Sequence, residues 1–207
     1  MDKSKLAVDT YEKIAQKYTD QYFNDLVDIP YINKFLELLP KNGKILDVGS
    51  GPGQFAKHMM ERGFEVVGID YSKEMVRIAQ KQVPDGDFRY MDMRHLEFKD
   101  EEFDGIFSAY SLIHIPSEEV FETLKGFHRV LKVGGCLEIG VQQGEPDKII
   151  DEPFMPTEKM FFNFFTQERL AKFIQDAGFE VVSQELMAID DAETMSDKVI
   201  YIIARKA

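Results

Sequence analysis

A short apolar strand that breaks into a glycine-rich turn is the feature that most constrains the fold of this chain. Residues 45–48 favour a strand, and Gly49, Gly51 and Gly53 follow with one residue between each. A helical pattern begins near Gln54. Glycine adopts positive φ and lets a ligand approach the backbone, while the start of the helix offers unpaired N–H groups. The sequence therefore predicts a strand, a tight turn and a helix that together can hold a ligand.

An acidic residue after the next strand indicates what kind of ligand. The predicted strand 65–69 ends at Asp70, which lies 21 residues after Gly49. This is close to the roughly 20 residues expected for an acid that binds ribose hydroxyls, so a nucleoside is favoured. The glycine spacing is G-x-G-x-G, whereas the dinucleotide fingerprint is G-x-G-x-x-G. A turn that only closes a βαβ unit is the alternative, and the position of Asp70 argues against it.

These motifs resemble those of a known family. Residues 47–53, Asp-Val-Gly-Ser-Gly-Pro-Gly, are similar to the first motif of class I S-adenosylmethionine-dependent methyltransferases, and residues 68–72 are similar to their acidic second-strand loop. The resemblance implies S-adenosylmethionine as cofactor, with its methionine part on the glycine turn, its ribose on Asp70 and its adenine between Tyr71, Met75 and Asp92. The cofactor-binding residues that it implies are Asp47, Gly49, Ser50, Gly51, Gly53, Asp70, Tyr71, Met75, Asp92, Met93 and Ser108.

The rest of the chain fits the fold of that family. Residues 112–115, Leu-Ile-His-Ile, and residues 130–135 are similar to its fourth and fifth motifs, with Val133 in place of the usual proline. Two final strands, 179–186 and 198–206, follow each other without a crossover helix and should pair antiparallel. We therefore expect an α/β fold, a Rossmann-like doubly wound sheet of about seven strands, mostly parallel, with an antiparallel C-terminal hairpin.

The length of 207 residues suits a single methyltransferase domain, 1–207. We expect an N-terminal helical lid over 1–40, a cofactor-binding core over 41–141, a substrate-side insert over 142–165, and a C-terminal helix and β-hairpin over 166–207. Tyr11 and Tyr18 fall on one face of the first helix, in a pattern similar to the lid of many small-molecule methyltransferases. The resemblance implies that they close the cofactor site, and the alternative is that they pack in the core.

The composition and net charge restrict the kinds of partner that we expect for this chain. The net charge of −12 repels phosphate backbones, so no nucleic-acid partner is expected. No apolar run reaches the roughly 20 residues of a membrane span, and the first residues resemble neither a secretory signal nor a transit peptide. Cys136 is the single cysteine and no zinc-ligand spacing occurs, so we expect a cytoplasmic protein without a metal. A monomer and a homodimer remain equally open.

Methyl transfer from a sulfonium needs two reactants held in line, and a base only if the nucleophile arrives protonated. His114, after the fourth strand, is the candidate catalytic base; the alternative is that it packs under the lid. Aromatic residues in the N-terminal helices, in 110–116 and in 155–165 predict a small, partly apolar or aromatic substrate with an O-, N- or C-nucleophile. The alternative functions are a non-catalytic S-adenosylmethionine or S-adenosylhomocysteine binding module and a nicotinamide-dependent oxidoreductase.

Overall fold

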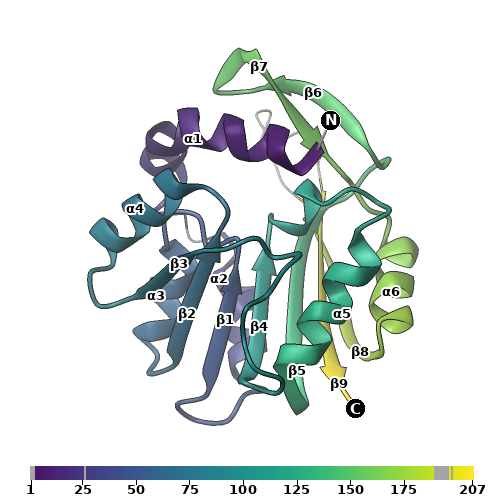
Figure 1. Cartoon of the computed structure of the whole chain (residues 1–207). Coiled ribbons are helices and arrows are strands. Elements are labelled where there is room, and N and C mark those ends of the chain that lie inside the picture. Colours follow the sequence, from purple (N-terminus) through teal and green to yellow (C-terminus); the bar gives the residue numbers. More distant parts are fainter. Residues whose placement is uncertain (1–2, 26, 189–195, 197) are drawn as a thin grey trace.

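The computed structural model describes residues 3–25, 27–188, 196 and 198–207, and these form an α/β fold around one seven-stranded sheet (Figure 1). The strand order is β3-β2-β1-β4-β5-β9-β8. The strands are β1 (Lys44–Val48), β2 (Glu65–Asp70), β3 (Asp87–Tyr90), β4 (Phe103–Ala109), β5 (Leu131–Gln142), β8 (Phe179–Ala188) and β9 (Lys198–Lys206). The pairs among β1 to β5 are parallel, whereas β9 is antiparallel to both β5 and β8. The predicted sheet and its C-terminal hairpin are confirmed.

Helices cover both faces of the sheet, which is why its central strands read as nearly continuous apolar runs. On one face lie α2 (Ile29–Leu36), α3 (Gln54–Met60) and α4 (Lys73–Gln82), and on the other lie α5 (Val120–Val130) and α6 (Gln167–Asp176). A short 3₁₀ helix, η1 (Leu112–His114), follows β4. The hydroxyl of Ser72 caps α4 by accepting the N–H of Met75 at 3.1 Å.

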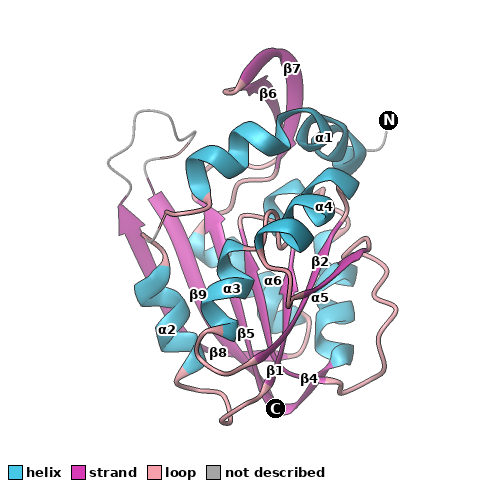
Figure 2. Cartoon of the chain, turned by 90° about the vertical axis from the view of Figure 1, so that its left-hand side faces the viewer, coloured by secondary structure: helices cyan, strands magenta, loops and turns pink. Residues whose placement is uncertain are grey.

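The N-terminal helix lies apart from these layers. Helix α1 (Lys3–Tyr22) crosses above the carboxyl ends of the parallel strands and beside α4, as Figure 2 shows from the side. Helix α2 does not share this position, because Ile32 and Phe35 pack against the face of the sheet. Of the predicted lid over 1–40, only α1 covers the edge where a ligand would bind.

The segment 142–165, which has no regular pattern in the sequence, contains a second, two-stranded sheet. Strands β6 (Lys148–Glu152) and β7 (Met155–Phe162) pair antiparallel, and β7 packs along α1. The strand pattern is weak because much of the hairpin is exposed, with Ile149 at 57%. The acidic connection that the sequence predicts between the last two strands lies outside the described residues, apart from its margins and Ser196. None of the described helices is long and apolar enough to cross a membrane.

Candidate active site

The three glycines of the turn after β1 have positive φ, but for different reasons. A Cβ at Gly49 would lie 2.3 Å from the Cβ of Ser111, and one at Gly53 would lie 2.9 Å from the ring of Phe88. At Gly51 the nearest atom would be Oε1 of Gln54, 4.0 Å away. The first and third glycines therefore let the chain pack closely, whereas the second exposes its backbone to open space.

Asp70, at the end of β2, holds this turn in place. One carboxylate oxygen accepts the N–H of Gly51 at 2.9 Å, and the other accepts the N–H of Ser72 at 2.8 Å. Burial raises the pKa of Asp70 to about 6. Burial, together with the charge of Asp70, raises the pKa of the neighbouring Asp47 to about 8. Among the described residues neither carboxyl group forms an ion pair, so a positively charged ligand would be stabilised here.

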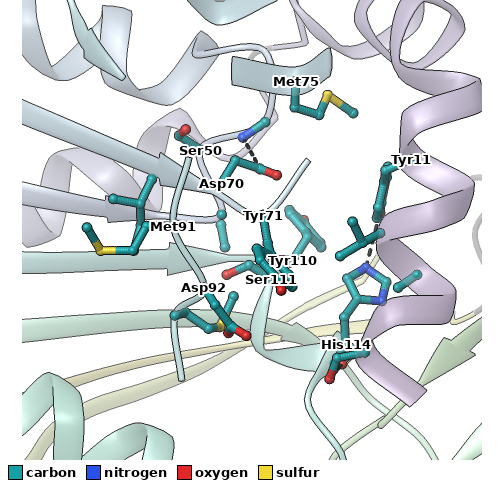
Figure 3. Close-up of a pocket in the computed structure, with 18 of the residues that line it drawn as sticks. Tyr11, Ser50, Asp70, Tyr71, Met75, Met91, Asp92, Tyr110, Ser111 and His114 are labelled. Atoms are coloured by element: carbon teal, nitrogen blue, oxygen red, sulfur yellow. Dashed lines mark hydrogen bonds between the residues drawn. The ribbon is translucent and has the colours of Figure 1, made fainter. Parts of the chain in front are cut away.

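A cavity of about 100 Å³, which we call the turn pocket, lies between α1 and the carboxyl ends of the strands (Figure 3). Most of the predicted site residues line it: Tyr11, Tyr18, Gly49, Ser50, Gly51, Asp70, Tyr71, Met75, Asp92, Met93 and His114. Three predicted residues do not. Asp47 and Ser108 are buried behind the pocket wall, and Gly53 caps α3 against Phe88.

Several lining residues were missed by the sequence analysis, among them Gln54, Met91 and Ser111. Ser111 donates its hydroxyl hydrogen to the carbonyl oxygen of Val48 at 2.7 Å, and its Oγ lies 2.8 Å from Oγ of Ser108. It thereby ties the loop after β4 to the end of β1. Gln54 directly follows the glycine turn, so its position in the sequence could have identified it as a lining residue. The contact of Ser111 with the end of β1 is visible only in the three-dimensional structure.

Asp92 and Tyr71, which the sequence places near adenine, both have partners in the structure. The carboxylate of Asp92 accepts from the guanidinium of Arg94 at 2.7 Å, and Arg94 also reaches Glu119 at 2.8 Å. The ring of Tyr71 stacks on that of Tyr90 with centroids 5.3 Å apart. Both residues still line the turn pocket, and their contact with adenine stays a prediction.

His114 connects the site to the lid. Its Nδ1 lies 3.0 Å from the carbonyl oxygen of Phe161, which can only accept, so Nδ1 carries the hydrogen and Nε2 is the acceptor. The hydroxyl of Tyr11 donates to Nε2 at 3.1 Å, as Figure 3 shows. Burial lowers the pKa of His114 to about 4, so the ring is neutral at pH 7. It can accept a substrate proton only after Tyr11 moves away, and its role as a base stays a prediction.

A second and larger cavity, which we call the lid cavity, adjoins the turn pocket under α1 and has a volume of about 550 Å³. The two share the lining residues Tyr11, Tyr18, Gln54, Phe55 and Tyr110. Other parts of the lining come from the chain before α2 and from the turn between β6 and β7. Its size lies within the roughly 300–1,000 Å³ of small-molecule sites.

Solved structures share this fold. A methyltransferase from Methanosarcina mazei matches with a TM-score of 0.77 and 22% identity, over 86% of this chain and 97% of that one. The 1,6-didemethyltoxoflavin-N1-methyltransferase of Burkholderia thailandensis matches with a TM-score of 0.78 and 19% identity, over 99% of this chain and 88% of that one. These identities establish the fold alone.

The sequence comparisons find methyltransferases. Residues 45–135 match a methyltransferase domain. The putative methyltransferase YqeM of Bacillus subtilis is 36% identical over 132 residues, 60% of this chain, and the demethylmenaquinone methyltransferase of Chlorobaculum parvum is 37% identical over 97 residues, 46% of this chain. This chain spans 53% and 39% of the length of these two relatives. These matches are to methyltransferases, and the matched residues include the glycine turn and Asp70, as the resemblance of the motifs to the class I S-adenosylmethionine-dependent family implies.

The sequence motifs and the methyltransferase relatives imply S-adenosylmethionine as cofactor, and the residues at the turn fit it. Asp47 Oδ2, Ser50 Oγ and Gln54 Oε1 are buried without a hydrogen-bond partner in the part of the chain that the structure describes. Ser50 and Gln54 line the turn pocket beside Gly51, where the backbone faces open space, whereas Asp47 is buried behind the pocket wall. A nucleoside with a charged amino-acid tail would supply the missing polar partners.

Helix α1 lies over the turn pocket. The turn pocket, at about 100 Å³, is smaller than the roughly 300 Å³ at which ligand sites begin. No group of three or more His, Cys, Asp or Glu that could hold a metal occurs within the described ranges.

Proposed function

We propose that this chain transfers a methyl group from S-adenosylmethionine to a small molecule held in the lid cavity. The observation that carries the proposal is that a nucleoside-type site at the glycine turn and a larger, aromatic cavity share one wall, with Tyr11, Gln54 and Tyr110 lining both. A methyl group bound at the first would lie next to a molecule bound in the second. The B. thailandensis structure in the same fold holds 1,6-didemethyltoxoflavin and S-adenosylhomocysteine, a small-molecule substrate and a cofactor product.

The residues of the turn pocket have distinct parts in binding. Each carboxylate oxygen of Asp70 has a second acceptor site beyond its bond to Gly51 or Ser72, and these sites accept ribose hydroxyls. Tyr71 and Met75 offer apolar walls for adenine, with Asp92 and the backbone of Met93 at its polar edge; Ser50 and Gly51 line the opposite part of the pocket. When bound, S-adenosylmethionine supplies an electrophilic methyl group.

The lid supplies orientation and excludes water. Tyr11 and Tyr18 of α1 reach both cavities, and β7 packs beside the same helix, so closure encloses both ligands. Holding reacting atoms about 3–3.5 Å apart and in line lowers the barrier by several kcal/mol without an acid or base. For an acceptor that arrives protonated, neutral His114 is the proposed base, acting when the Tyr11 hydroxyl has left its Nε2.

Calorimetry with S-adenosylmethionine, S-adenosylhomocysteine and NAD tests the cofactor assignment. We expect roughly micromolar binding of the first two and none of NAD. The variant Asp70→Asn should weaken S-adenosylhomocysteine binding by about 1–3 kcal/mol, because ribose hydroxyls lose a charged acceptor. Asp85→Asn, in an exposed turn, is the matched control and should leave it unchanged.

Tight NAD binding, or an unchanged affinity in Asp70→Asn, would contradict this assignment. Catalysis is tested separately by release of S-adenosylhomocysteine from S-adenosylmethionine in the presence of small phenols, amines and thiols. Cofactor binding without turnover of any acceptor would instead support the non-catalytic binding module.

A further inference from the structure

The lid cavity is acidic as well as aromatic. The carboxylates of Asp25, Asp28 and Glu152 contribute to its lining, and among the described residues that line it none is lysine, arginine or histidine. A ligand bound in the lid cavity is therefore close to negative formal charge and not to positive formal charge. In a cavity partly walled by protein, such charges interact with a ligand more strongly than they would on an open surface.

Asp28, just before α2, is the most enclosed of these acids. It is 6% exposed and accepts hydrogen bonds from the hydroxyls of Tyr110, at 2.9 Å, and Tyr201. Burial raises its pKa, and the two tyrosine hydroxyls offset this only in part. It forms no ion pair with a described basic residue, so its charge is compensated by neutral donors alone.

Glu152 approaches the cavity from the other side, at the end of β6. It is 3% exposed and accepts the N–H of Met155 at 2.7 Å. Burial raises its pKa, and Lys17 is the basic side chain among the described residues that acts against this. Lys17 lies on the exposed side of α1 and donates to the carbonyl oxygen of Phe154 at 3.3 Å. Glu152 is thus a second buried acid without a direct cationic partner in the described structure.

The neutral part of the lining suits the same kind of ligand. Rings of Tyr18 and Tyr22 lie 4.8 Å apart, and Tyr22 meets Phe154 at 5.9 Å, which gives a wall of aromatic faces that attract cations. Gln54 and Gln142 also line the cavity, and their amide oxygens are buried without a hydrogen-bond partner among the described residues. Carboxylates and amide oxygens are acceptors, and an ammonium group has only donors to offer.

We propose that the small molecule bound in the lid cavity is an amine in its cationic form that also carries an aromatic or apolar group, with Asp28 and Glu152 as the residues that select its charge. The inference rests on the proposed function for its assumption that this cavity holds the methyl acceptor. A buried acid costs free energy until a cation pairs with it, so a bound ammonium is stabilised, whereas a carboxylate or phosphate is repelled.

Three probes that share one ring system and differ in charge test this. Tryptamine, tryptophol and indole-3-acetate are titrated by calorimetry into the protein saturated with S-adenosylhomocysteine, so that the cofactor's own amino group is already in place. We expect tryptamine to bind at least roughly tenfold more tightly than tryptophol, the size of one charge-assisted hydrogen bond, and indole-3-acetate to bind least. Glu152→Gln and Asp28→Asn should each reduce the tryptamine preference to about threefold or less, while Glu158→Gln, on β7 outside the lining, should retain it.

Equal binding of tryptamine and tryptophol, tighter binding of indole-3-acetate, binding of none of the three, or a preference that survives in both variants would each overturn the proposal. Thermal melts establish that the variants fold. Asp28 also accepts hydrogen bonds from two tyrosines, so Asp28→Asn can fail to fold, and Glu152→Gln then carries the test by itself. S-adenosylhomocysteine binding is measured first. Its absence refutes the proposed function, whereas its presence without an amine preference refutes only this inference.

Discussion

Two alanine substitutions two residues apart should separate packing from binding in the glycine turn. In Gly49→Ala the new Cβ would lie 2.3 Å from Ser111 Cβ, at a φ of 71°. A left-handed conformation costs an alanine about 1–2 kcal/mol and overpacking adds about 1–3 kcal/mol, so we expect a loss of about 2–5 kcal/mol in unfolding free energy. In Gly51→Ala, with φ of 53° and no atom nearer than 4.0 Å, only the conformational cost of about 1–2 kcal/mol applies.

Ligand binding should be weakened in Gly51→Ala, although this is the less destabilised of the two variants. The Cβ of Gly51→Ala would stand in the open space of the turn pocket, so S-adenosylhomocysteine should bind at least about tenfold more weakly even though the protein folds. Urea unfolding gives the stability of both variants and calorimetry gives the affinity of the folded one. Equal destabilisation of the two variants, or full affinity in Gly51→Ala, would refute this division of roles.

Further predictions concern the buried groups around the site. His114 is neutral in the fold, with a pKa of about 4 against 6.5 unfolded, so its contribution to stability is lost as pH falls through this window. The stability of the wild type relative to His114→Gln should therefore drop by about 2 kcal/mol between pH 7 and pH 5 in urea unfolding, and a constant difference would contradict the low pKa. For Asp47 the pH dependence of stability has the opposite sign, because its folded pKa of about 8 lies above the unfolded value of 3.8. Between pH 5 and pH 8 the unfolding free energy of Asp47→Asn relative to the wild type should therefore rise by up to about 4 kcal/mol. Parallel pH profiles of the two proteins would rule this out. Tyr11→Phe removes the hydrogen bond to His114 and should cost about 1–2 kcal/mol and speed amide exchange in α1, where unchanged exchange would show that this bond does not hold the lid.

Features that depend on a few neighbouring residues could be predicted from the sequence. The turn at Gly49 to Gly53, the acid at Asp70 and the two final strands follow from local conformational preference and from spacing along the chain, and the structure has them where the sequence predicts them. The hairpin of β6 and β7 was not predicted, because its exposed strands carry little alternation.

The sequence by itself determined the α/β fold and the glycine turn followed by an acid, because backbone bends and strand ends are encoded by residues close together in the chain. Only the tertiary structure decided which side chains meet across the site. His114 lies 103 residues from Tyr11 and is held by its hydroxyl, and Asp28 and Glu152 border one cavity although they are far apart in the sequence. Such contacts arise from packing between distant elements, and no spacing rule records them.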